Sequence, residues 1–251
     1  MRTAVYPASR MYYERVLPSV KSLLCNSDVD QVVLTIEDDE YPGQLPECVK
    51  TVNAQKVFGG YFSGDGPNIV RTPYVYLCMA RVVYAGVLRT LGLVPEGDGR
   101  VLALDADTLV MKDIGSEPWE MDLGDAEIGG VPEVKISQEI GRPYVNAGVL
   151  LMDLDRIRER GLDVVMCQEL DRTYWQWLEQ DVINTFCKVK PLGAEWNACQ
   201  FTQTHGCADV SGWVKIRHWA YEVGGWCANM EVERYRQMSW EEVMKRWKSR
   251  R

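Results

Sequence analysis

Short apolar runs alternate with amphipathic segments along the chain, and this alternation predicts a mixed α/β fold. Residues 3–6 are expected to form a strand, and residues 31–36 a second one. Between them, apolar residues from Val16 to Leu24 recur at the spacing of one helical face. A strand, a helix and a strand in this order predict a parallel βαβ unit at the start of the chain.

The rest of the chain continues this alternation. Thr72 and Pro73 predict the start of a helix that runs to Gly92, with Arg81 on its apolar side. A buried arginine needs an anionic partner, which could be a carboxylate of the protein, a phosphate or a carboxylate of a sugar site. Further strands are expected at residues 128–131, 144–152 and 215–219, and further helices at 164–170, from 179 onward and at 239–250.

The segment Val101–Val110 is the most informative part of the pattern. Four apolar residues predict a buried central strand, and Asp105 and Asp107 follow where that strand should end. Ligands of open α/β sheets bind outside the carboxyl ends of the strands, and two carboxylates separated by one residue on extended chain point the same way. Such a pair suits Mg²⁺ or Mn²⁺ carrying substrate phosphates. An isolated Asp-x-Asp is more often a strand that runs into a polar turn.

Composition narrows the classes of protein. With 251 residues and 46% hydrophobic content, the chain can form one large domain, with or without small appendages. A net charge of −8 argues against a protein that binds nucleic acid by neutralising phosphates. The eight cysteines include no Cys-x-x-Cys pair, and neither a signal peptide nor a long apolar run is recognisable. We therefore expect a soluble, cytoplasmic and reduced protein.

Several further motifs agree with a known family. They are Leu104–Leu109 around the acidic pair, Tyr144–Met152, Gln180–Asn184, and His218 with Trp226. Together, and in this order, they resemble glycosyltransferase family 8, the glycogenin-like and bacterial lipopolysaccharide galactosyltransferase-like enzymes. The resemblance implies a GT-A fold, a single Rossmann-like α/β domain with a mostly parallel central sheet flanked by helices, plus a C-terminal helix. We expect a catalytic domain at residues 1–228 and a helical extension at 229–251.

The resemblance also implies a metal site and a donor. Asp105, Asp107 and His218 match the metal ligands of the family, and Mn²⁺ is the expected ion, with Mg²⁺ as an alternative. The donor is expected to be a UDP-hexose, most often UDP-glucose or UDP-galactose, and Tyr12 matches the aromatic residue that stacks on uracil. The residues implied in catalysis are Gln180, Asp181 and Arg81. Those implied in donor binding are Ala8, Tyr12, Arg81, Asp105, Ala106, Asp107, Glu133, Asn146, Ala147, Gln180 and His218.

The sequence departs from the family pattern at several places. Ser9 replaces an Asp after the first strand, and Glu133 stands where the family usually has Asp. In the closing motif, Tyr221, Gly224 and Gly225 replace a Gly, a diphosphate-binding Lys and a Pro. Either another cation, such as Arg81, Lys215 or Arg217, contacts the diphosphate, or the leaving group is less stabilised. A nucleotidyltransferase and a catalytically weak nucleotide-sugar-binding protein therefore remain alternatives.

Two further questions remain open at this level. Retention of the anomeric configuration could proceed through a nucleophile, for which Asp181 is the only adjacent carboxylate, or by the front-face route that we favour. In the terminal helix, Trp240, Val243 and Trp247 form an apolar stripe beside basic residues. This stripe is expected to pack on the catalytic domain or, alternatively, to contact an anionic membrane. The sequence identifies neither the acceptor, which could be carbohydrate, lipid-linked or protein, nor the oligomeric state.

Overall fold

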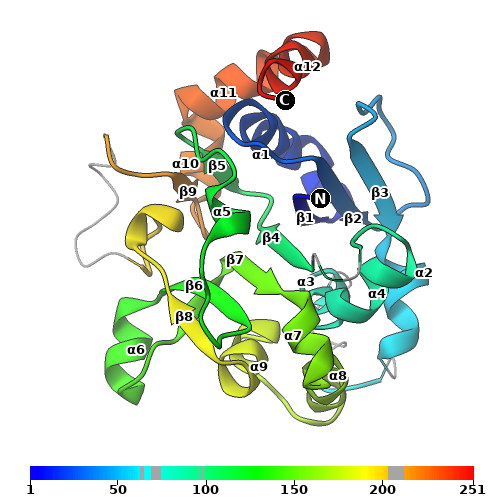
Figure 1. The fold of residues 1–251 in the computed structure, drawn as a ribbon, viewed down its shortest axis with the longest axis vertical. Helices are drawn as coiled ribbons and strands as arrows, with labels where there is room; N and C mark the ends of the chain where they lie inside the picture. Colours follow the sequence, from blue (N-terminus) through cyan, green and yellow to red (C-terminus); the bar gives the residue numbers. More distant parts are fainter. Residues whose placement is uncertain (63–64, 69–74, 96, 98, 203–211) are drawn as a thin grey trace.

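The computed structural model describes residues 1–62, 65–68, 75–95, 97, 99–202 and 212–251. Within these residues, seven strands form the central sheet in the order β3-β2-β1-β4-β7-β6-β8, and β5 pairs with β9 in a small second sheet (Figure 1). The strands are β1 (Thr3–Ala8), β2 (Gln31–Ile36), β3 (Val49–Asn53), β4 (Arg100–Leu104), β5 (Thr108–Val110), β6 (Ile128–Pro132), β7 (Val145–Asp153), β8 (Val189–Pro191) and β9 (Ile216–His218).

Helices cover both faces of the central sheet. The α-helices are α1 (Tyr13–Asn26), α2 (Ala54–Phe58), α3 (Val75–Met79), α4 (Tyr84–Thr90), α5 (Glu117–Glu120), α6 (Val134–Ile140), α7 (Leu154–Glu159), α8 (Leu162–Arg172), α9 (Glu179–Phe186), α10 (Val223–Ala228), α11 (Met230–Gln237) and α12 (Trp240–Ser249). Four short 3-10 helices complete the described elements, η1 (Arg10–Tyr12), η2 (Gly59–Tyr61), η4 (Ala80–Val83) and η5 (Ala194–Trp196).

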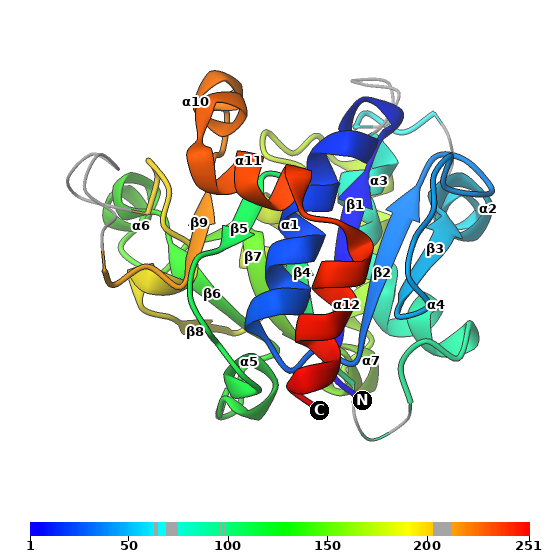
Figure 2. The same cartoon turned by 90° about the horizontal axis from the view of Figure 1, so that it is seen from above.

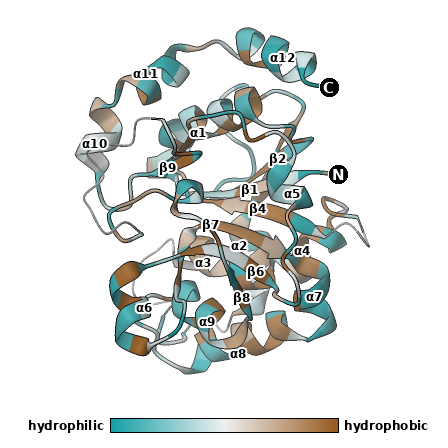
Figure 3. Cartoon of the chain, turned by 60° about the vertical axis from the view of Figure 1, so that its left-hand side comes forward, coloured by the Kyte–Doolittle hydropathy of each residue, from teal (hydrophilic) through white to brown (hydrophobic). Residues whose placement is uncertain are grey.

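The predicted βαβ unit and the mostly parallel sheet are confirmed. β1 pairs in parallel with β2 and β4, and β2 pairs in parallel with β3. Only β7 among these seven strands runs in the opposite direction, since it is antiparallel to both β4 and β6. The strands β1, β4 and β7 are largely hydrophobic (Figure 3), as expected for strands with helices on both faces.

Two apolar cores lie on opposite faces of the sheet. One contains α1 together with the C-terminal helices, and the other contains α3, α4, α7, α8 and α9. Figure 2 shows α12 beside α1, and both α11 and α12 contact α1. The apolar stripe of the terminal helix is therefore used for packing: Val243 is fully buried, Trp240 and Trp247 are partly buried, and the Trp247 indole donates to the Val29 carbonyl.

The last two residues of the chain, which follow α12, are paired with acidic residues of the domain. Arg250 contacts Asp28 and Asp113, and Arg251 contacts Asp30. These contacts favour the packing alternative over a membrane surface for α12. None of the helices in the described part of the chain combines the length and apolar character that crossing a bilayer requires.

The helix expected from Thr72 to Gly92 is not continuous. Thr72 and Pro73 lie outside the described residues, and the described part divides into α3, the 3-10 helix η4 and α4. The 3-10 turn contains Arg81, whose side chain reaches the carboxylates of Asp105 and Glu179. Short 3-10 stretches inside helical segments commonly accompany such functional constraints.

Candidate functional site

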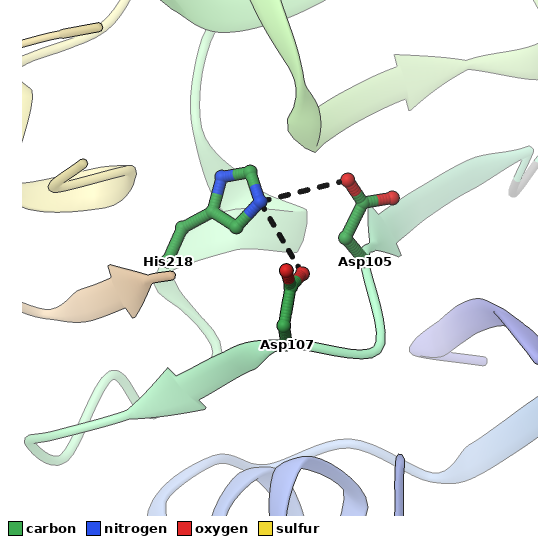
Figure 4. Close-up of side chains that lie close together, drawn as sticks. All are labelled: Asp105, Asp107 and His218. Carbon is green, nitrogen blue, oxygen red and sulfur yellow. Dashed lines mark ion pairs between the residues drawn. The ribbon is translucent and has the colours of Figure 1, made fainter. Parts of the chain in front are cut away.

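The acidic pair occupies a turn between β4 and β5. The Thr108 amide and hydroxyl both donate to the Asp105 carbonyl, so the chain is bent here. The sequence pattern instead predicts extended chain at this position. The turn still directs the side chains of Asp105 and Asp107 toward His218, which ends β9 (Figure 4). Ligand atoms of these three residues all lie within 4.8 Å of one another.

The distances suit a common divalent cation. His218 Nε2 lies 3.3 Å from Asp107 Oδ1 and 3.6 Å from Asp105 Oδ2. Ligand atoms around an ion of the Mg²⁺ class lie about 2.1 Å from the ion and therefore about 3 Å from each other. Two carboxylates and an imidazole also form a mixed set that suits Mn²⁺.

A second contact fixes the imidazole of His218 in the required tautomer. His218 Nδ1 lies 3.0 Å from Asn197 Oδ1, an acceptor, so Nδ1 carries the proton and Nε2 faces the carboxylates. Burial alone would lower the pKa of His218, but the charge of Asp107, hydrogen bonds to Asp107 and Cys199, and the charge of Asp105 together raise it to about 10. In the absence of a metal ion, the protonated ring therefore supplies the positive charge that the two carboxylates require.

Gly148 lies inside β7, at a position where any side chain would collide with His218. A Cβ at this position would lie 2.1 Å from His218 Cε1, far closer than any side chain tolerates. The glycine therefore makes room for the imidazole, and β7 supports the site from below: the Gly148 carbonyl also accepts a hydrogen bond from the Asp105 amide.

Arg81 binds protein carboxylates in the floor of the cleft. It is 2% exposed, and its guanidinium pairs with Asp105, with Glu179 at 3.5 Å, and with the Ala147 carbonyl at 2.7 Å. Burial would lower the pKa of Arg81, but Asp105 and Glu179 raise it, so the side chain stays charged. Of the alternatives that the sequence left open, pairing with an Asp of the protein is the one observed.

A chain of amides and one carboxylate connects His218 to Gln180 in the cavity. The Asn197 amide donates to Asn146, at 2.9 Å, and the Asn146 amide donates to Glu133, at 2.8 Å. Glu133 also accepts from Gln180 Nε2 at 3.0 Å, while Gln180 Oε1 accepts from the Ala147 amide at 2.8 Å. These bonds hold the predicted residues Glu133, Asn146 and Gln180 in one network.

Glu179 and Asn197 belong to this site but were not among the predicted residues. Desolvation raises the pKa of Glu179 to about 7, although Arg81 acts in the opposite direction. Glu179 could have been predicted from the sequence, because it is adjacent to Gln180 and because a buried Arg81 requires a carboxylate partner. Nothing in the sequence distinguished Asn197, because its role depends on a contact with His218, 21 residues away.

Asp181 faces a different cavity from Gln180. Its two carboxylate oxygens accept hydrogen bonds from the Tyr144 hydroxyl and the Trp177 amide. Burial, and then the bond to Asp181, raise the pKa of Tyr144, so this phenol remains a donor. Asp181 lines a second cavity of about 960 Å³, beside α6, that shares Glu133, Trp177 and other residues with the first.

The first cavity, of about 510 Å³, contains most of the predicted site. Tyr12 and Ser9 line one part of it, whereas Ala8 is buried in β1 and does not. The guanidinium of Arg15 lies 5.1 Å from the centre of the Tyr12 ring. The predicted residues that line this cavity are Tyr12, Arg81, Asp105, Ala106, Asp107, Glu133, Asn146, Ala147, Gln180 and His218.

Lys215 and Arg217, two candidates to replace the missing lysine, do not line the cavity. Lys215 pairs with Glu117 at 2.6 Å, and Arg217 pairs with Glu222 at 3.2 Å. Neither lines the cavity, where Arg81 and His218 are the basic side chains among the described lining residues. Because Arg81 is already paired with carboxylates, little positive charge of the protein remains for a diphosphate.

The comparisons with known proteins agree with this geometry. The family model described as glycosyl transferase family 8 matches residues 93–224, which is just over half of the 251 residues. The chain belongs to glycosyltransferase family 8. The matched segment contains the acidic pair, residues 146–148 of β7, Gln180 and His218. No curated protein matches the sequence.

Solved structures of similar fold are glycosyltransferases. The galactosyltransferase LgtC, in complex with donor and acceptor sugar analogues, is 18% identical with a TM-score of 0.60, over 99% of this chain and 100% of its own. GlyE of Streptococcus pneumoniae TIGR4 is 18% identical, with a TM-score of 0.65, over 99% of this chain and 63% of its own.

The bifunctional glycosyltransferase WbbM is 14% identical, with a TM-score of 0.67, over 98% of this chain and 51% of its own. This chain therefore spans about half the length of WbbM. At these identities the likeness shows the fold, and it confirms the predicted GT-A architecture.

Proposed function

We propose that this family 8 glycosyltransferase moves a hexose from a UDP-hexose, with UDP-glucose or UDP-galactose as the donor, to a sugar acceptor, with Mn²⁺ as the metal ion. The observation that carries the proposal is the convergence of Asp105, Asp107 and His218 at the carboxyl end of β4, next to the network that contains Gln180. The complexes of LgtC with donor and acceptor sugar analogues support the class of substrates.

The residues assigned to donor binding form three groups, one each for the metal ion, the base and the sugar. Asp105, Asp107 and His218 would hold the divalent cation, which when bound supplies the positive charge that lets a diphosphate depart. Tyr12, which lines the cavity, offers an aromatic face for the base. Glu133 and Gln180 offer carboxylate and amide groups to the hydroxyls of the sugar.

The contacts of Gln180 and Asp181 favour a front-face route to retention. The Gln180 oxygen already accepts the Ala147 amide, and an amide is a poor nucleophile. Both oxygens of Asp181 accept hydrogen bonds from the protein in the second cavity. In the front-face route these residues position the sugar and stabilise charge, while the departing phosphate oxygen accepts the proton of the acceptor hydroxyl.

Product analysis tests this function. The protein is incubated with a panel of UDP-sugars and simple glycosides, with Mn²⁺, with Mg²⁺ or with chelator, and free UDP and pyrophosphate are both measured. We expect UDP release that requires the metal ion and that increases when a suitable glycoside is present. Pyrophosphate release would instead indicate a nucleotidyltransferase, and tight UDP binding without product would indicate a binding protein.

A further inference from the structure

Tyr221 is an exposed aromatic residue in a backbone conformation that disfavours it. Its φ is 62°, in the left-handed region where glycine alone avoids a steric cost. Leu178, the other such non-glycine residue in the described part of the chain, packs against the apolar core. Tyr221 is 76% exposed, so core packing does not compensate for its conformation. Strained residues that persist in this way cluster at ligand sites.

The ring of Tyr221 lies in the first cavity, beside Phe201, which both cavities share. Tyr221 lines the first cavity together with Asp105 and Gln180, and Phe201 lines both cavities. The rings of Phe201 and Tyr221 meet edge to face, with centroids 6.0 Å apart and planes at 87°. A hydrogen bond of 2.9 Å from Gln200 to the Ala220 carbonyl joins the two segments beside the rings. We call this pair of rings the aromatic rim.

The chemistry of the aromatic rim suits an uncharged sugar ring. An aromatic ring offers an apolar face to the C–H groups of a pyranose, and the phenol adds a hydrogen-bond donor for a hydroxyl. Partial desolvation and the charges of Asp105, Glu133 and Glu179 raise the pKa of Tyr221, so this hydroxyl stays protonated. Neither ring carries the positive charge that a diphosphate requires.

The position favours the acceptor over the donor. The base is assigned to Tyr12 and the diphosphate to the candidate metal ligands, none of which lines the second cavity. Phe201 of the rim lines both the first cavity and this second cavity of about 960 Å³. We propose that Tyr221, supported by Phe201, binds the ring of the acceptor sugar and so determines which acceptors the enzyme accepts. This inference rests on the proposed function. The family motif has glycine at this position, so the family pattern does not assign a binding role to it.

Two substitutions at Tyr221 test the inference, and both are expected to leave the protein folded. Tyr221→Asn removes the ring while keeping a residue that tolerates the left-handed conformation, and Tyr221→Phe keeps the ring. Binding of methyl β-galactoside, methyl β-glucoside and lactose is followed by saturation-transfer NMR in the presence of UDP and diamagnetic Mg²⁺. The thermal midpoint of each variant, measured in parallel, is expected not to fall below that of the wild type.

We expect the Kd of the best-bound glycoside to rise about tenfold in Tyr221→Asn and by no more than about twofold in Tyr221→Phe, with UDP affinity changed far less. Phe201→Leu should weaken glycoside binding to an intermediate extent. The inference is wrong if no glycoside in the panel binds the wild type, if Tyr221→Asn binds it equally well, or if only UDP affinity falls. Absence of UDP binding by the wild type would instead contradict the proposed function, while the glycoside titrations would still report on Tyr221.

Discussion

The two sides of the cleft differ in how closely their side chains are held. On the metal side, His218 is connected through Asn197 and Asn146 to Glu133, and all four side chains are buried. In the segment that follows His218, Tyr221 is exposed, and a Cβ at Gly224 would meet no atom within 4 Å.

This difference agrees with the departures in the closing motif, where Tyr221 and Gly224 are exposed, but not with the departure at Ser9, which is buried. In the buried network each polar atom needs a specific partner, and replacing one residue would leave others unsatisfied. Tyr221 and Gly224 are exposed to solvent, so these two positions can change without disturbing the core. The strongest effects of mutation are therefore expected on the metal side, and the weakest in the segment from Tyr221 to Gly224.

The largest effect is expected for Asp107→Ala. Removing one of three ligands should reduce Mn²⁺ affinity by more than about a hundredfold, because even residues that only support metal ligands contribute tenfold to a hundredfold. Titration of Mn²⁺ followed by electron paramagnetic resonance measures it. Asp38→Ala is the matched control, since Asp38 pairs with Arg10 outside the cleft. Equal Mn²⁺ affinity in the Asp107 variant and the control would contradict the assignment of the site.

Gly148→Ala should have the next largest effect. The added Cβ would overlap the His218 ring, which must move away from Asp105 and Asp107, and Mn²⁺ affinity should fall about tenfold to a hundredfold. Gly60→Ala adds the same methyl group where no atom lies within 4 Å and serves as the control. Unchanged metal affinity in Gly148→Ala would show that His218 does not need its present position.

Gln180→Ala should slow turnover and leave the nucleotide bound. We expect kcat to fall about tenfold to a hundredfold, since a group that positions the sugar contributes about 1.4 to 2.7 kcal/mol at the transition state. UDP affinity, measured by calorimetry, should change far less because the amide contacts the sugar end of the cavity. Mass spectrometry of the protein during turnover is the complementary test, and a glycosyl adduct on Asp181 would contradict the front-face route.

The smallest effect is expected for Gly224→Lys. This substitution restores the cation of the family motif at an open position of α10, and a charge-assisted contact should tighten UDP binding by up to about tenfold. Gly224→Gln, which is of similar length but uncharged, is the control. Weaker UDP binding in the lysine variant than in the glutamine variant would show that the diphosphate does not approach this segment.

The elements of the fold could largely be predicted from the sequence, because apolar periodicity records which faces are buried. β4, β7 and α1 follow directly from it. The helix expected from Thr72 to Gly92 was less predictable, because the 3-10 turn at Arg81 depends on carboxylates that are distant in sequence.

The site was predicted as a set of residue types, but its connections were not. Asp105, Asp107 and His218 were identified by motif, and the structure brings them together. Asn197 orients His218, and Asp181 faces the second cavity. Both arrangements depend on how β7, β9 and α9 pack, which residue types do not reveal. The exposed Tyr221 was visible only as a departure from the family motif, because its backbone conformation cannot be read from residue type.

Calorimetric titration of UDP into the wild-type protein tests the central claim most directly, namely that a divalent cation held by Asp105, Asp107 and His218 carries the diphosphate. The titrations are made with Mn²⁺, with Mg²⁺ and with chelator. Since the basic side chains among the described lining residues are already paired with carboxylates, we predict modest UDP affinity with Mn²⁺, weaker affinity with Mg²⁺ and a large loss in chelator. UDP binding that is equally tight in chelator would contradict the claim, and absence of UDP binding with every metal would contradict the nucleotide-sugar function itself.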